Sequence, residues 1–156
     1  MKYMTFKTTV AAVAAAACTL LALPASAQFA KAEEAIKYRQ GSLFVIGQHF
    51  GRIGAMVNGK LPFDAKAAQD NADIVAAMAA LPWTGFGPGT DKGAPHKAKP
   101  AVWSEQAKFN EHAQTFQTEA GKLAAAARTG KLDQIKAAFG PAAQSCKSCH
   151  DAFRNR

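Results

Sequence analysis

The sequence predicts an all-α protein, an up-down-up-down antiparallel four-helix bundle with a long loop between helices 2 and 3. Apolar residues recur at helical spacing in four segments, and no segment shows the alternation typical of a strand. Glycine and proline gather between the second and third segments, at residues 82–102. Four amphipathic helices with three connections, one of them long, favour this bundle topology.

The first predicted helix spans residues 31–57 and carries a narrow apolar stripe of the kind found in bundle seams. Arg39 interrupts that stripe, where a charge is expensive unless it is paired. We therefore expect Arg39 either to reach the rim of the core or to meet an anion. Two lines of heptad spacing form the stripe: Ile36, Leu43, Phe50 and Val57 on one, Ile46 and Ile53 on the other.

Asp64 is the expected N-cap of a second helix over residues 65–80. Pro82 follows it and opens the turn-rich stretch 82–102, which is longer than usual connections. Such a loop indicates a functional role or a segment that wraps around a ligand.

Ser104 is the expected cap of a third helix that runs to about Thr129, with Gly130 placed to end it. A fourth helix begins at Leu132. We expect Gly140-Pro141 to kink or interrupt it, because proline removes a backbone hydrogen bond, before a last segment that runs to about residue 154.

That last segment contains Cys146-Lys147-Ser148-Cys149-His150, the C-x-x-C-H pattern of covalent haem attachment. On a helix or tight turn both thiols reach one edge of a porphyrin and can add to its two vinyl groups. His150 is then close enough to ligate the iron from one face. The motif predicts one covalent haem c per chain, attached through Cys146 and Cys149.

Other interpretations of these five residues fit less well. A thioredoxin-type pair belongs in a βαβ setting, and the sequence shows no strand. Zinc requires four ligands, and His49, His96 and His112 form no second cluster. A disulfide between cysteines three apart in a helix is sterically poor.

Residues 1–27 are expected to be a cleaved secretory signal peptide, and residues 28–156 the haem-binding bundle. The leader has a positive start, an apolar run at residues 10–23 and the small-residue cleavage site Ala25-Ser26-Ala27. The run is too short for a comfortable membrane span. Cys18 lies inside it, but Ala15 and the apolar residues after Cys18 argue against a lipid anchor. Export predicts a periplasmic location and no stable membrane insertion.

The charge balance fits several partners. Two of the 19 Lys and Arg side chains lie in residues 1–27, so the remaining 17 against 11 Asp and Glu give residues 28–156 a charge of +6. Such a surface suits acidic redox partners, anionic lipid headgroups or simple solubility. Nucleic acid is not an expected partner, because no basic run is interleaved with aromatic residues and the chain is exported.

The sixth iron position separates a gas binder from an electron carrier. A low-spin carrier places methionine or histidine there. Met56 and Met78 are most simply core residues, and His49 is expected at the outer flank of the first helix. Leu43 lies instead on the inner face of the first predicted helix, where it would cover the distal side of a haem. Arg154 lies one helical turn beyond His150, either to polarise that side of the haem or as an exposed charge at a helix end.

The chain from residue 28 onward resembles cytochrome c′, the class II c-type cytochromes, over essentially its whole length. The resemblance rests on residues 28–31 and 37–40, on Leu81-Pro82-Trp83 and Phe86-Gly87-Pro88-Gly89-Thr90, on Trp103-Ser104, and on Ala138-Phe139-Gly140 leading to the segment 146–154. The segment Asp91–Lys99 departs from the family pattern with extra residues, so its haem contacts are not assigned.

The resemblance implies a five-coordinate, high-spin haem iron bound by His150 and covered on its distal face by Leu43. It implies that Arg39 and Gln40 contact the propionates and that Arg154 lies near the proximal histidine. It also implies binding of nitric oxide and carbon monoxide, discrimination against dioxygen, and a homodimer formed by the first two helices.

The resulting hypothesis is a periplasmic haem protein, not an enzyme, that binds nitric oxide and undergoes one-electron redox chemistry with an unidentified partner. The alternative is a simple periplasmic electron-transfer cytochrome with a six-coordinate iron. The sequence shows no distal His/Arg pair to assist O–O cleavage, which argues against a peroxidase.

Overall fold

The computed structural model describes residues 28–156, and the predicted leader with its cleavage site and Cys18 lies outside the described residues. Four long helices carry most of the described chain, and the long loop contains a 3₁₀ turn and a short helix. Their bounds are α1 (Ala32–Val57), α2 (Ala65–Met78), η1 (Pro82–Phe86), α3 (Ala101–Ser104), α4 (Gln106–Ala127) and α5 (Leu132–Phe153).

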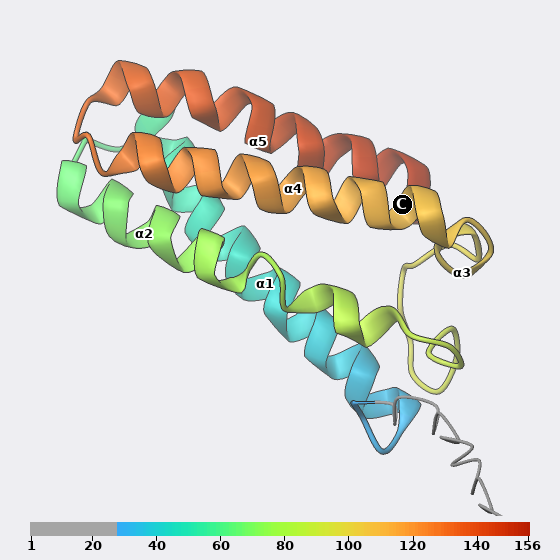
Figure 1. Cartoon of the computed structure of the whole chain (residues 1–156). Helices are drawn as coiled ribbons and strands as arrows, with labels where there is room; N and C mark the ends of the chain where they lie inside the picture. Colours follow the sequence, from blue (N-terminus) through green and yellow to red (C-terminus); the bar gives the residue numbers. More distant parts are fainter. Residues whose placement is uncertain (1–27) are drawn as a thin grey trace, which may run out of the picture.

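The four long helices form an antiparallel bundle in which α1 packs on α2, α2 on α4, α4 on α5 and α5 on α1. Figure 1 shows α4 and α5 side by side along their length, whereas α1 diverges from them towards its N-terminal end. Residues 28–156 contain no β-strand, only an isolated bridge between Ala98 and Arg154. The predicted fold class is confirmed. None of the helices in this part of the chain is long and apolar enough to cross a membrane.

The core consists of three successive apolar clusters along the bundle. Small alanines and aliphatic residues form the one next to the α1–α2 and α4–α5 connections, and aromatic residues form the one beneath the long loop. Of the two predicted lines on α1, the one with Ile46 and Ile53 is fully buried, while Leu43, Phe50 and Val57 are half-buried. Representative members of the three clusters, in order, are Ile53 and Leu123, Val75 and Phe116, and Phe86 and Phe109.

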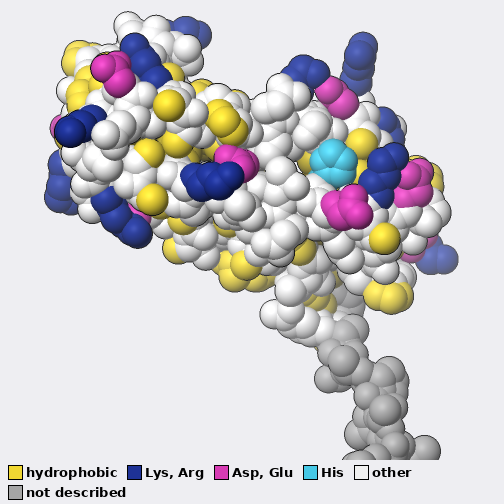
Figure 2. Space-filling view, turned by 45° about the horizontal axis from the view of Figure 1, so that its top comes forward, with side chains coloured by type: hydrophobic (Ala, Val, Ile, Leu, Met, Phe, Trp, Pro, Cys, Tyr) yellow, Lys and Arg dark blue, Asp and Glu magenta, His cyan; other side chains and the backbone are white. Residues whose placement is uncertain are grey.

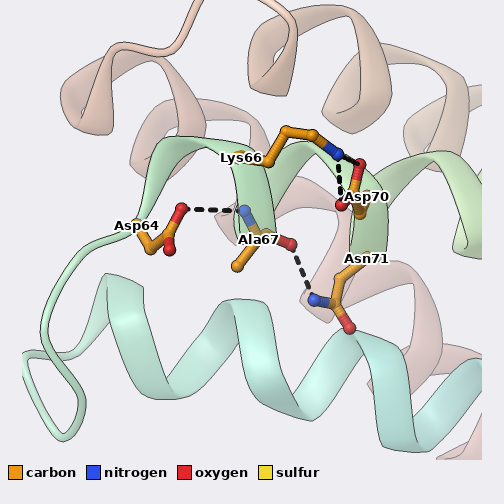
Figure 3. A network of polar contacts seen from close by, with 5 residues as sticks. All are labelled: Asp64, Lys66, Ala67, Asp70 and Asn71. Atoms are coloured by element: carbon orange, nitrogen blue, oxygen red, sulfur yellow. Dashed lines mark hydrogen bonds and ion pairs between the residues drawn. The ribbon is translucent and has the colours of Figure 1, made fainter.

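The start of α2 follows the sequence prediction (Figure 3). Asp64 caps it, because the carboxylate accepts a hydrogen bond of 3.0 Å from the backbone N–H of Ala67. Lys66 and Asp70 pair at i, i+4 on the exposed side, with 2.7 Å between Nζ and Oδ2. The Asn71 side chain donates back to the carbonyl of Ala67 at 2.6 Å.

Two predicted boundaries are wrong. Ser104 does not cap the third long helix: it ends the short helix α3, and α4 begins at Gln106 after Glu105 leaves the helical conformation. Pro141 does not interrupt the last helix, since α5 is continuous through it. The missing N–H costs one hydrogen bond, and Ile135, Ala142 and Ser145 are buried on both sides of the proline. Tertiary packing therefore overrides the local signal.

The surface carries both signs of charge. Figure 2 shows Lys and Arg side chains dispersed among Asp and Glu on the face it presents. Several pairs are short-range neighbours on one helix, such as Lys122 with Glu119, and Arg128 bridges α4 to Asp73 of α2 at 2.7 Å. Exposed pairs of this kind contribute little to stability.

Candidate haem site

Helix α5 carries the C-x-x-C-H motif in its last two turns. Cys146 and Cys149 are both free and half-buried. Burial raises the pKa of the Cys146 thiol. A hydrogen bond with Ser145 lowers it, but the effect of burial is larger. Burial and then the neighbouring Cys146 raise the pKa of Cys149 to about 11. In the chain as described, both sulfurs are therefore thiols at neutral pH. Among residues 28–156, no three His, Cys, Asp or Glu side chains gather to hold a metal ion.

His150 follows on the same helix and is exposed. Partial burial of its ring lowers the pKa of the imidazole, the Arg154 cation lowers it further, and Asp151 raises it. The neutral imidazole is the form that ligates a metal. The sequence predicted that Arg154 lies one helical turn beyond His150, but Arg154 does not continue the helix. Its backbone is extended, and it forms the bridge to Ala98, although its N–H still donates to the carbonyl of His150 at 3.0 Å.

Arg39 lies on the inner side of α1 and is only 2 % exposed, so of its two expected positions the rim of the core is excluded. Its Nη1 donates to the Gly85 carbonyl at 2.7 Å and to Thr90 Oγ1 at 3.1 Å. Its guanidinium carbon lies 4.4 Å from the Phe86 ring centre and 5.4 Å from that of Trp103. Burial lowers its pKa to about 10, which still leaves the side chain charged at neutral pH.

One nitrogen of this guanidinium, Nη2, is buried and has no hydrogen-bond partner. No carboxylate of residues 28–156 lies within ion-pair distance of Arg39. A buried cation without an anion is strongly unfavourable, and an unsatisfied buried donor adds to that cost. The geometry therefore points to an anion that the protein chain does not supply.

Leu43 lies one turn after Arg39 and packs against the aromatic cluster that also receives Cys149. Cys146 packs one cluster further along the bundle, against residues such as Val75 and Phe116. Gln40 is exposed, and its Nε2 donates to the Pro95 carbonyl at 3.0 Å. The structure thus brings Arg39, Leu43 and Cys149 to a shared cluster, while Gln40 contacts the long loop.

The segment Asp91–Lys99 joins α1 to α5, a contact that the sequence did not reveal. Beyond the Gln40 contact with Pro95, the Lys99 backbone N–H donates to the Phe153 carbonyl at 2.9 Å. His96 folds the segment, with Nε2 at 2.8 Å from the Asp91 carbonyl and Nδ1 accepting from Ala98 N–H at 3.2 Å. The length of the segment was the only feature of the sequence that pointed to it. Its extra residues show no periodicity from which a contact could be predicted.

The three side chains considered as sixth iron ligands make other contacts in the bundle. Met56 belongs to the core cluster at the opposite end, and Met78 packs on the middle cluster. His49 lies half-buried between α1 and α2 rather than at the outer flank, with Nδ1 at 2.8 Å from Asn71 Oδ1. Both methionines therefore serve as core residues, as predicted.

The residues present fit a covalently attached haem. Two thiols and an imidazole follow one another on α5, which is the donor set of a c-type haem. The aromatic cluster offers apolar surface, and Arg39 offers one unpaired buried nitrogen suited to a carboxylate.

Residues 34–154 match the family model of cytochrome C′. The chain belongs to the cytochrome c′ family. Membership implies a haem c cofactor, and the family comprises haem proteins that bind gases and transfer electrons rather than classical enzymes.

Relatives match over nearly their whole length. Cytochrome c′ of Alcaligenes xylosoxydans xylosoxydans is 46% identical over 129 residues, which cover 83% of this chain and 99% of the relative. The crystal structure of cytochrome c′ from Rubrivivax gelatinosus is 51% identical, with a TM-score of 0.80, and covers 82% of this chain and 100% of that one. A nitric oxide complex of a leucine-to-alanine variant of cytochrome c prime from Alcaligenes xylosoxidans is 45% identical, with a TM-score of 0.76, and covers 83% and 99%.

Gly85 is the position where η1 touches α1. A Cβ there would lie 2.7 Å from the Ala35 carbonyl oxygen and 2.9 Å from Arg39 Cβ. We predict that Gly85→Ala lowers the free energy of unfolding by about 1–3 kcal/mol, because η1 must move away from α1. Urea titration measures this. Gly87→Ala is the matched control, since a Cβ at Gly87 meets nothing within 4 Å and its φ of −66° suits alanine. Equal losses in both variants would contradict the close approach at Gly85.

Proposed function

We propose that this protein is a periplasmic haem c protein whose iron is five-coordinate and high-spin, binds nitric oxide and carbon monoxide, and undergoes one-electron redox chemistry. The observation that supports it most is the unpaired nitrogen of the buried Arg39, on the same cluster as Cys149. Haem c, when bound, supplies an iron that takes a diatomic ligand and changes its charge by one electron.

The protein's own residues have distinct parts in this proposal. Cys146 and Cys149 attach one haem per chain through thioether bonds, and His150 is the axial iron ligand. Arg39 holds a propionate with its free nitrogen, and Gln40 lies beside it. Arg154 places a cation near His150, which agrees with its effect on the pKa of that imidazole.

Leu43 covers the distal face in this proposal and excludes water and polar ligands. Leu43 is the sixteenth residue counted from Gln28, and the solved nitric oxide complexes of the Alcaligenes protein include variants of a leucine at the sixteenth position. The alternative, an electron carrier with a six-coordinate iron, receives no support from Met56, Met78 or His49, which contact other parts of the bundle.

Export through a cleaved leader at residues 1–27 completes the proposal and places the protein in the periplasm. The alignment with the Alcaligenes relative supports it, since 129 residues match and residues 28–156 have that same length. Thioether attachment in bacteria takes place after export, so the leader and the motif agree.

The electronic spectrum tests the function. We expect the purified protein to keep its pigment in acidified acetone, because thioethers hold the haem. We also expect broad high-spin bands in the ferrous form, with a change when nitric oxide is added. Sharp low-spin α and β bands before ligand addition would support the six-coordinate carrier instead. A colourless protein would overturn both.

Leu43→Ala tests the distal face. We predict that carbon monoxide binds the ferrous variant about tenfold faster or more, because removing the leucine lowers a steric barrier by ~1.4 kcal/mol or more. Stopped-flow absorbance measures the rate. Leu61→Ala is the control, since Leu61 is exposed in the α1–α2 connection. Equal rates for wild type and Leu43→Ala would contradict the proposal that Leu43 covers the distal face.

A homodimer through α1 and α2 is part of the proposal. Phe44 on α1 is 65% exposed and Ile74 on α2 is 36% exposed. Counted from the contact of His49 with Asn71, Phe44 lies five residues back along α1 and Ile74 three residues forward along α2. Because the two helices are antiparallel, both residues lie on the same side of that contact. An apolar pair on the outer face of both helices suits a second copy of the chain.

Phe44→Glu tests this interface. We predict a dimer dissociation constant at least about tenfold higher, because burying one large apolar side chain contributes ~1.5–3 kcal/mol. Sedimentation equilibrium measures it. Leu61→Glu, which removes another exposed apolar side chain outside both helices, should dissociate like the wild type. A dimer that tolerates Phe44→Glu, or a monomeric wild type, would contradict the proposal.

A further inference from the structure

The free nitrogen of Arg39 is directed by a small set of neighbours from the long loop. Both hydrogens of Nη1 are used, one on the Gly85 carbonyl and one on Thr90 Oγ1. The Phe86 and Trp103 rings lie 4.4 Å and 5.4 Å from the guanidinium carbon. These contacts leave Nη2 as the buried nitrogen without a partner.

Thr90 has a double role in this set. Its hydroxyl accepts from Arg39 Nη1 and donates to the Gly87 carbonyl at 2.8 Å. The same carbonyl accepts from Trp103 Nε1 at 3.2 Å. The Thr90 hydroxyl therefore connects Arg39 to the Gly87 carbonyl. That carbonyl in turn binds the indole of Trp103, which flanks the arginine. Thr90 is itself buried, so water does not replace its hydrogen bonds.

Charged side chains are scarce around this set. Burial lowers the pKa of Arg39, and no carboxylate of residues 28–156 lies within ion-pair distance of it. Titratable side chains next to the set are His96, whose ring centre lies 5.7 Å from that of Trp103, and the exposed Asp91, which follows Thr90 in the sequence. An anion at Nη2 therefore interacts with a guanidinium whose orientation is fixed and whose charge is weakly screened.

We propose that Thr90 is a positioning residue: through its hydroxyl it holds the Arg39 guanidinium so that Nη2 faces a haem propionate, and it thereby sets the pH range over which the haem potential changes. This inference rests on the proposed function. A paired propionate stays ionised to lower pH, because a hydrogen bond from a cation stabilises the charged form. An ionised propionate stabilises the ferric state, so the potential falls as pH rises through the propionate pKa.

The test is the midpoint potential of the haem-loaded protein as a function of pH, measured by spectroelectrochemistry. Thr90→Val keeps the shape and removes the hydroxyl. We expect its inflection at a pH higher by about half a unit to one unit, since a less well-held arginine lowers the propionate pKa less. Thr90→Ser, which keeps a hydroxyl, should restore the wild-type profile.

Thr84→Val is the matched control. Thr84 lies in η1 of the same long loop and is exposed, and its hydroxyl donates to the Leu81 carbonyl at 3.1 Å. Its profile should equal that of the wild type. Should Thr90→Val fail to accumulate, Trp103→Phe removes the indole donor to the Gly87 carbonyl and keeps a ring, and an upward shift is again expected.

The outcomes separate the two proposals. A wild-type protein without haem overturns both. A haem-loaded Thr90→Val whose inflection coincides with that of the wild type overturns the role of Thr90 alone, as does a failure of Thr90→Ser to restore it. An inflection caused by His96 or Asp91 would stay at one pH in all threonine variants, and that result also overturns the inference.

Discussion

One buried cation constrains much of this structure. The Arg39 guanidinium lies inside the bundle without a carboxylate beside it. Neutral groups stabilise it: a carbonyl, a hydroxyl and two aromatic faces. Such groups offset only part of the loss of hydration. The long loop must approach α1 closely to provide them, which is why Gly85 stands where any Cβ would meet the Ala35 carbonyl.

The two ends of the bundle are built differently. At the end with the α1–α2 and α4–α5 connections, alanines such as Ala68 and Ala72 let the helices approach closely around Ile53 and Leu123. At the other end α1 diverges (Figure 1). The cluster at that end consists mainly of aromatic side chains from the loop, α4 and α5. The haem motif lies at this second end. The aromatic cluster therefore provides apolar surface beside the haem motif.

The segment Asp91–Lys99 connects the parts that the proposed site requires. Its Pro95 carbonyl accepts a hydrogen bond from the Gln40 side chain of α1, and its backbone forms hydrogen bonds with the end of α5. His96 folds the segment internally. Since these contacts involve mostly backbone groups, they depend on loop path rather than on side-chain type. The segment therefore links α1 to α5, a pair of helices that make few direct contacts with each other.

The sequence by itself determined the bundle class, the Asp64 cap and the haem motif on the last helix, because each depends on spacing within one segment. It also singled out Arg39 as a charge on an apolar line. Only the tertiary structure decided that Arg39 is buried with one free nitrogen, that α5 continues through Pro141, and that Ser104 ends a separate short helix. Each of these depends on neighbours distant in sequence. Whether a local signal prevails is decided by the free energy of packing between segments, which no single segment contains.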